Sequence, residues 1–139
     1  MELTIELLEE KFKEYNKKYF SNRLPWIEIG LNNSFACYGE FRCDSHKPGR
    51  PLKNAIITIS CYYDYTEEQL RDVLVHEMVH YKLERSKNPP KRMHGKEFKA
   101  MIAEMNEKYG LNMTAKGKIQ GLKISENAPK KSWARFFFT

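Results

Sequence analysis

One segment near the middle of the chain constrains the fold more than any other. Residues 66–85 read TEEQLRDVLVHEMVHYKLER and begin with a capping-box pattern. In that pattern the Thr66 hydroxyl accepts a hydrogen bond from the backbone N–H of Gln69, and the Gln69 side chain reaches back to the Thr66 backbone. Apolar residues then fall on most faces of the predicted helix, so the rest of the chain must enclose it. We therefore expect its histidines to be buried or to line a cleft.

Two further helices are predicted. Residues 4–20 carry many charges, but one apolar stripe recurs at helical spacing, which is typical of a helix that packs one face on the core. The stripe consists of Leu8, Phe12, Tyr15 and Tyr19. After the two prolines of SKNPPKRM, a helix should run from about Gly95 to Tyr109, because Gly110 suits the left-handed conformation that ends many helices.

Several short segments predict strands. Residues 26–31, 34–41 and 55–60 are partly β-branched or aromatic and are separated by turn residues. The connection before the last of them contains two prolines and a glycine, which should keep it irregular. Residues 118–125 and 133–138 could add two strands as a hairpin. Helices and a small sheet of three or more strands together predict an α+β fold.

The composition is that of one ordinary globular domain. The chain has 139 residues, of which 41% are hydrophobic and 30% charged. We expect residues 1–139 to form one domain, with a core of about 4–110 and a basic extension, 111–139, packed on it. No run approaches the roughly 20 apolar residues of a membrane span. The N-terminus has glutamates where a secretory signal would have lysines, so a cytoplasmic location is expected.

The cysteines agree with that location. Cys37, Cys43 and Cys61 are odd in number and form no CxxC pair, so they suggest neither a disulfide framework nor a zinc ribbon. We expect them to be buried structural thiols in or beside strands.

The positive charge belongs to the second half of the chain. Residues 1–80 carry ten Lys and Arg against thirteen Asp and Glu, whereas residues 81–139 carry fourteen against five. A nucleic-acid partner would favour such a distribution, because basic side chains that neutralise phosphates release counterions. A solvated basic face has the same composition, so charge alone does not decide between the two.

Three of the four histidines lie within one stretch of 19 residues, HEMVHYKLERSKNPPKRMH. His76 and His80 are four apart on the predicted helix, so both imidazoles can reach one cation at about 2.0–2.1 Å. Glu77 is displaced around the helix and would reach the open side of that cation through a water, as a general base does. The pattern HExxH therefore predicts a catalytic zinc site.

A catalytic zinc needs a third protein ligand and an open position for water. His94 is the favoured candidate, since it follows a short proline-broken loop and can point back at the first helix. Glu97 and Glu104 are the alternatives and would give a site of two histidines and one carboxylate. His46 lies in a polar, proline-bounded loop and reads as a surface histidine rather than a fourth ligand.

Several segments together resemble a known family. YFSNRLPWIEIGL, ACYGEF, AIITIS, LVHEMVH and HGKEFKAMI follow one another in the order found in the SprT-like metallopeptidases, which include the bacterial SprT proteins and the eukaryotic protease Spartan. The resemblance covers about residues 10–109. It implies a zincin-like domain of the minigluzincin type with one catalytic Zn2+ ion, His76, His80 and His94 as ligands, and Glu77 as base. It also implies a protein substrate that could be bound or crosslinked to DNA, and a nucleoid-associated protein if DNA is bound.

The chain departs from this family after the catalytic part. Many SprT-like proteins carry a cysteine-rich zinc ribbon there, but residues 111–139 contain no cysteine. Basic residues alternate with aromatic ones instead, a pattern that can follow a single nucleic-acid strand through phosphate contacts and base stacking. The candidate contacts are Lys116, Lys118, Lys123, Lys130, Lys131, Arg135 and Trp133. The alternative is a terminal strand that covers the core with its lysines outward.

Three functions are compatible with these features. The first is peptide hydrolysis by zinc and Glu77, with Tyr38, Tyr81 or His46 as an additional donor to the oxyanion. The second is a nucleic-acid-binding module whose zinc site is structural or vestigial. The third is a metal-dependent hydrolase that acts on something other than protein.

Overall fold

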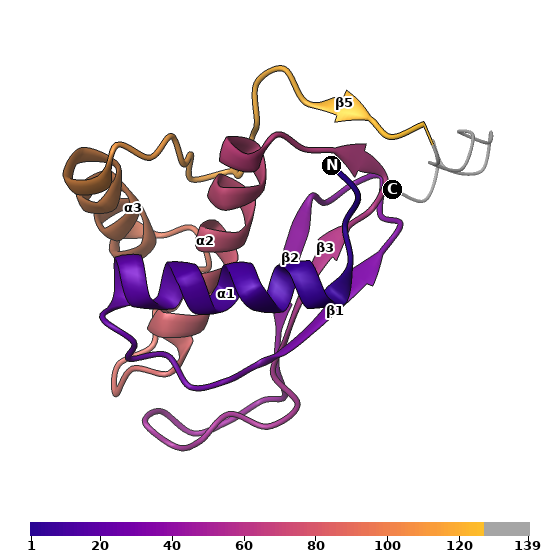
Figure 1. The fold of residues 1–139 in the computed structure, drawn as a ribbon. Coiled ribbons are helices and arrows are strands. Elements are labelled where there is room, and N and C mark those ends of the chain that lie inside the picture. The colour runs from indigo at the N-terminus through magenta and orange to yellow at the C-terminus, as the bar shows by residue number, and fades with distance from the viewer. Residues whose placement is uncertain (127–139) are drawn as a thin grey trace.

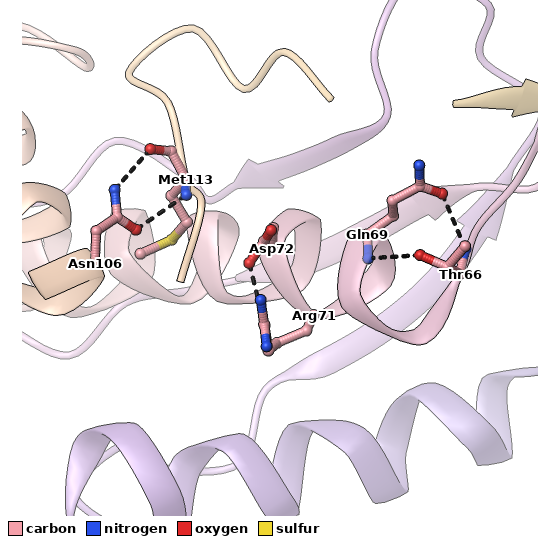
Figure 2. Close-up of polar contacts among 6 residues, drawn as sticks. All are labelled: Thr66, Gln69, Arg71, Asp72, Asn106 and Met113. Carbon is pink, nitrogen blue, oxygen red and sulfur yellow. Dashed lines mark hydrogen bonds and ion pairs between the residues drawn. The ribbon is translucent and has the colours of Figure 1, made fainter. Parts of the chain in front are cut away.

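The helix predicted from the capping box lies at the centre of this computed structural model, which describes residues 1–126. It is α2, Glu67–Glu84, and buried residues occur on nearly all of its faces. The Thr66 hydroxyl accepts from the Gln69 backbone N–H at 3.2 Å, and the Gln69 side-chain oxygen accepts from the Thr66 N–H at 2.9 Å (Figure 2). The predicted start and enclosure of this helix are confirmed.

The two other helices also lie where the sequence predicts them. Helix α1, Ile5–Phe20, packs against α2 and the first strand, and the predicted apolar stripe is buried (Figure 1). Helix α3, Lys96–Tyr109, packs against α2 and ends at Gly110, whose φ is 68°. None of the helices among residues 1–126 is long and apolar enough to cross a membrane.

A small mixed sheet completes the α+β fold. Its strands are β1, Glu28–Asn32, β2, Gly39–Arg42, and β3, Ile56–Ser60, in the spatial order β1-β3-β2. The most buried strand, β3, is central; it pairs with β1 in parallel and with β2 antiparallel. Strand β2 is therefore an edge strand, and α2 packs against it.

The strand predicted at residues 34–41 is too long. Residues 34–38 form a loop in which side chains satisfy part of the backbone: Ser34 N–H donates to Asn32 Oδ1 at 3.1 Å, and Cys37 N–H donates to Ser34 Oγ at 3.1 Å. At its end, the Tyr38 carbonyl accepts from the Ser60 N–H of β3 at 2.8 Å. The buried-thiol prediction is also wrong. Cys37 is exposed, and Cys43 and Cys61 are only partly buried.

The chain after α3 turns back past the first turns of α2 (Figure 1). Leu111 and Met113 are buried in the core. The second strand of the predicted hairpin, residues 133–138, lies outside the described residues, so the hairpin stays a prediction. Within residues 118–125, β5, Lys123–Ile124, pairs antiparallel with β4, Tyr63–Asp64.

The Asn106 side chain forms two hydrogen bonds with the backbone of Met113, where the chain returns past α2. Asn106 Nδ2 donates to the Met113 carbonyl at 2.8 Å, and Met113 N–H donates to Asn106 Oδ1 at 3.0 Å (Figure 2). Asn16 holds Leu24 through the same pair of bonds, at 2.8 and 3.1 Å, in a different part of the molecule. The two pairs of hydrogen bonds, called clamps below, are chemically alike, but only the Asn106 clamp holds the first residue of segment 113–119.

Removing either clamp should destabilise the protein, and only one removal should affect the site. Asn106→Ala and Asn16→Ala each leave backbone groups without partners, so each should lower the free energy of unfolding by about 1–3 kcal/mol. Asn106→Ala should in addition reduce metal affinity, because segment 113–119 lines the cavity described below. Denaturant unfolding and metal titration check this. Equal metal affinity in the two variants would show that the Asn106 clamp does not support the site.

Candidate metal centre

Helix α2 and the segment before α3 bring three histidines together. His76 and His80 project from one face of α2, and His94 lies two residues before the first residue of α3. Their ligand atoms lie within 4.8 Å of one another. The two Nε2 atoms of His80 and His94 are 3.1 Å apart, close to the roughly 3.3 Å between two nitrogens that share a tetrahedral zinc at about 2.0–2.1 Å. These histidines could hold one metal ion.

Phe98 forms the apolar base of this cluster. It is fully buried in the first turn of α3, and its ring stacks on that of His80 with centroids 4.2 Å apart and planes 13° apart. The rings of His76 and His94 meet it edge-on or tilted, at 4.8 and 5.1 Å. One aromatic side chain thereby orients all three imidazoles.

The surroundings keep the three rings unprotonated, as metal ligands must be. Burial, with the nearby His94 as a second cause, lowers the pKa of His76 to about 4. Burial, followed by the two other histidines, lowers the pKa of His80 to about 3. Partial desolvation, followed by the positive charge of Lys99, lowers the pKa of His94, which is the most exposed of the three. His76 Nδ1 is in addition a buried polar atom without a hydrogen-bond partner among the described residues. Each of the three imidazoles has one nitrogen placed where it could bind a common cation.

Glu77 lies beside the histidines and is 7% exposed. Its Oε2 atom is 4.0 Å from His76 Nε2. Burial, followed by the negative charge of Glu40, raises the pKa of Glu77 to about 8. A divalent cation held by the histidines would oppose this effect and favour the carboxylate, because it would be the largest local charge.

The cluster opens into a cavity of about 540 Å³. One wall is the edge strand β2, a second is the histidine face of α2, and a third is segment 113–119. Gly117, with a φ of 72°, passes beside the His76 ring; a Cβ there would lie 3.5 Å from His76 Cε1. The returning chain thus covers one side of the histidines.

The three candidate oxyanion donors lie in different parts of the structure. Tyr38 lines the cavity. The Tyr81 hydroxyl donates to the Pro25 carbonyl at 3.2 Å, and its side chain lines a different cavity. His46 bonds Glu84 and does not line the cavity of the three histidines. Tyr81 and His46 are thus held elsewhere by their own partners.

The other candidate residues are dispersed. Glu97 and Glu104, the alternatives for the third ligand, are exposed and do not line the cavity. Lys116 and Lys118 line the cavity, whereas Lys123 is exposed on β5. Four further candidates for nucleic-acid contact lie outside the described residues: Lys130, Lys131, Trp133 and Arg135.

Several residues that line the cavity could not be predicted from the sequence as site residues. Glu40 and Asp72 both contribute carboxylates to its wall, and Asp72 is 6% exposed and paired with Arg71 at 3.2 Å (Figure 2). Gly39 permits the close approach of β2 to α2. The segment ACYGEF contains Gly39 and Glu40, but nothing local in it indicates that it faces the histidine helix.

Gly39→Ala should damage both stability and site. A Cβ at Gly39 would lie 3.0 Å from Val73 Cγ1 and 3.1 Å from Glu77 Cγ, so these side chains would have to shift. We expect a loss of about 1–3 kcal/mol in the free energy of unfolding, as for other overpacked cores, and a displaced Glu77. Gly30→Ala is the control, because a Cβ there meets Thr58 Cγ2 at an ordinary 3.5 Å. Equal thermal stability of the two variants would contradict this.

The elements and the clustered side chains define an α+β protein with a candidate three-histidine metal centre. The chain belongs to the SprT-like family, whose model matches residues 8–117 and thus contains the histidines, Glu77 and the cavity walls up to Gly117. The resemblance found in the sequence is thereby confirmed. None of the curated proteins compared with the chain matches it.

Proposed function

We propose that this protein is a zinc-dependent metallopeptidase. The observation that carries the proposal is the placement of three imidazoles and a buried glutamate along an edge strand. Three neutral imidazoles suit zinc, and the remaining position can take water or substrate. Membership of the SprT-like family supports the same activity.

The edge strand supports a peptide as substrate. In the described part of the chain, β2 pairs with β3 on one side only, and residues 39–41 line the cavity. An extended peptide can add to such an edge through backbone hydrogen bonds. It would then pass along the histidines in an extended form, with its side chains alternating toward and away from the cavity.

The residues divide the chemistry among them. When bound, zinc would polarise the scissile carbonyl and lower the pKa of its water. Glu77 would accept the proton from that water and deliver it to the leaving amine. Tyr38 is the remaining candidate donor to the developing oxyanion, since it lines the same cavity.

The proposed substrate class is protein bound or crosslinked to DNA. Lys116 and Lys118 lie at the cavity wall, and the second half of the chain carries the positive charge. These lysines also support the second candidate, a nucleic-acid-binding module with a structural or vestigial zinc. The third candidate is a metal-dependent hydrolase that acts on something other than protein.

One experiment separates the first two candidates. The zinc-loaded protein is incubated with a DNA-binding protein, with and without single- or double-stranded DNA, beside a chelated sample restored with zinc. We expect cleavage only with zinc and faster cleavage with DNA. DNA binding that weakens steeply with salt, without any cleavage, would favour the binding module. Cleavage that DNA does not accelerate would leave the peptidase but remove the DNA-linked substrate.

A further inference from the structure

A second cluster of metal-ligand side chains lies apart from the three histidines. Cys43 directly follows β2, His46 lies three residues later in the same loop, and Glu84 is the last residue of α2. One ligand atom from each lies within 4.8 Å of the others. None of the three lines the cavity of the histidine centre. The loop between β2 and β3 is thereby attached to the C-terminal end of the helix that carries HEMVH.

The orientation of His46 exposes one ring nitrogen to the cluster. Its Nδ1 is 3.2 Å from the Lys47 carbonyl and can only donate to it, which leaves the Nε2 lone pair free on a neutral ring. Nε2 points at Glu84 Oε1, 2.6 Å away. A backbone carbonyl on the far nitrogen is the arrangement that fixes the tautomer of metal-bound histidines. The His46 side chain is 9% exposed, within a loop whose other residues are largely exposed.

A positive charge is required between the two facing atoms. A free imidazole lone pair and a carboxylate oxygen at 2.6 Å repel each other unless a proton or a cation lies between them. A proton would account for His46 and Glu84, but it would leave the position of Cys43 unexplained. A metal ion would use all three side chains.

The loop holds this arrangement through bonds that do not involve the three side chains. Asp44 N–H donates to the Lys53 carbonyl at 3.0 Å, and Asn54 Nδ2 donates to Asp44 Oδ2 at 2.8 Å. Gly49, with a φ of 76°, brings the loop tip near Lys87; a Cβ there would lie 3.7 Å from Lys87 Cα. The Asp44 carboxylate is therefore occupied by Asn54, and the cluster consists of one thiol, one imidazole and one carboxylate.

We propose that Cys43, His46 and Glu84 bind a second metal ion, of the class of Zn2+. Thiolate, imidazole and carboxylate together suit zinc, and a fourth position remains for water. Ligand atoms on a tetrahedral zinc at about 2.0–2.3 Å lie roughly 3.3–3.6 Å apart, so Nε2 and Oε1 would separate by less than about 1 Å as the ion enters. The ion would tie the loop after β2 to α2 one turn beyond His80. It would act as a structural support of the catalytic helix.

Cobalt distinguishes this site from the histidine centre, because only the proposed site contains sulfur. The reduced, metal-free protein is titrated with Co2+, and the thiolate-to-cobalt charge-transfer absorption is recorded together with the metal stoichiometry. We expect two equivalents for the unaltered protein and a charge-transfer band. Cys43→Ser should lose that band and one equivalent. His94→Ala should lose the other equivalent and keep the band, so failure of the proposed peptidase function would not affect this result.

Two control variants test whether the band belongs to Cys43. Cys37→Ser and Cys61→Ser remove thiols that lie outside the cluster, and both should keep the band and two equivalents. Circular dichroism of each variant shows whether it folds. The proposal is overturned if the unaltered protein binds one equivalent without the band, or if the band persists in folded Cys43→Ser. Zinc analysis of the unaltered protein gives a check that needs no variant, because binding of only one zinc ion at saturation would also overturn the proposal.

Discussion

Glu77→Gln is expected to lower the rate of peptide hydrolysis by about 10²–10⁴-fold or more while zinc binding is retained. Glutamine has the size of glutamate and fits the same buried position on α2, but its amide cannot accept the proton from water. The three histidines are unchanged, so the metal stoichiometry should stay the same. Single-turnover cleavage assays and metal analysis of one preparation measure both quantities.

The control for this variant is Glu40→Gln. Glu40 is a second carboxylate of the cavity wall, on β2 rather than on the histidine helix, and it pairs with Arg42 at 2.7 Å. Its replacement should change the rate far less than that of Glu77. Undiminished cleavage by Glu77→Gln would remove Glu77 as the base, and an equal loss in both variants would indicate that the cavity needs negative charge rather than a base.

His94→Ala is expected to lower the metal affinity of the histidine centre by more than about 100-fold, because even residues that only orient ligands contribute 10–100-fold. His94 is exposed and precedes α3, so its loss should leave the stability of the metal-free protein within about 0.5 kcal/mol. Catalytic activity should fall with metal occupancy. Competition with a chelator and thermal unfolding without metal measure the two effects separately.

Glu97→Gln and Glu104→Gln are the matched controls for this experiment. Both carboxylates were alternatives for the third ligand, and both are exposed on α3. We expect neither change to weaken zinc binding. Loss of zinc in one of them, with zinc retained in His94→Ala, would establish a centre of two histidines and one carboxylate.

Residues that act within one or two helical turns were predicted correctly. The capping box of Thr66 and Gln69 depends on four consecutive residues, and the left-handed Gly110 ends α3 through a local backbone preference. The spacing of His76 and His80 depends only on the helical repeat. Such features need no knowledge of the rest of the fold.

Residues whose partners lie far along the chain were predicted less well. Tyr81 is on the same helix as His80, but its hydroxyl donates to the carbonyl of Pro25, 56 residues away along the chain. β5 pairs with β4 across about 60 residues of chain, and no local pattern specifies that pairing. The prediction of buried cysteines was wrong for the same reason, because the burial of a thiol depends on which parts of the chain pack beside it.

The sequence by itself determined the three helices, the α+β class, the HExxH face and the family, because these follow from short-range periodicity and from motifs read in order. Only the tertiary structure decided which side chains share a site. It placed Nε2 of His94 3.1 Å from Nε2 of His80, and it brought β2 and segment 113–119 to the cavity that Glu77 lines. It also placed Cys43 and His46 beside Glu84. These contacts depend on how the helices and the sheet pack, which the spacing of residues along the chain does not specify.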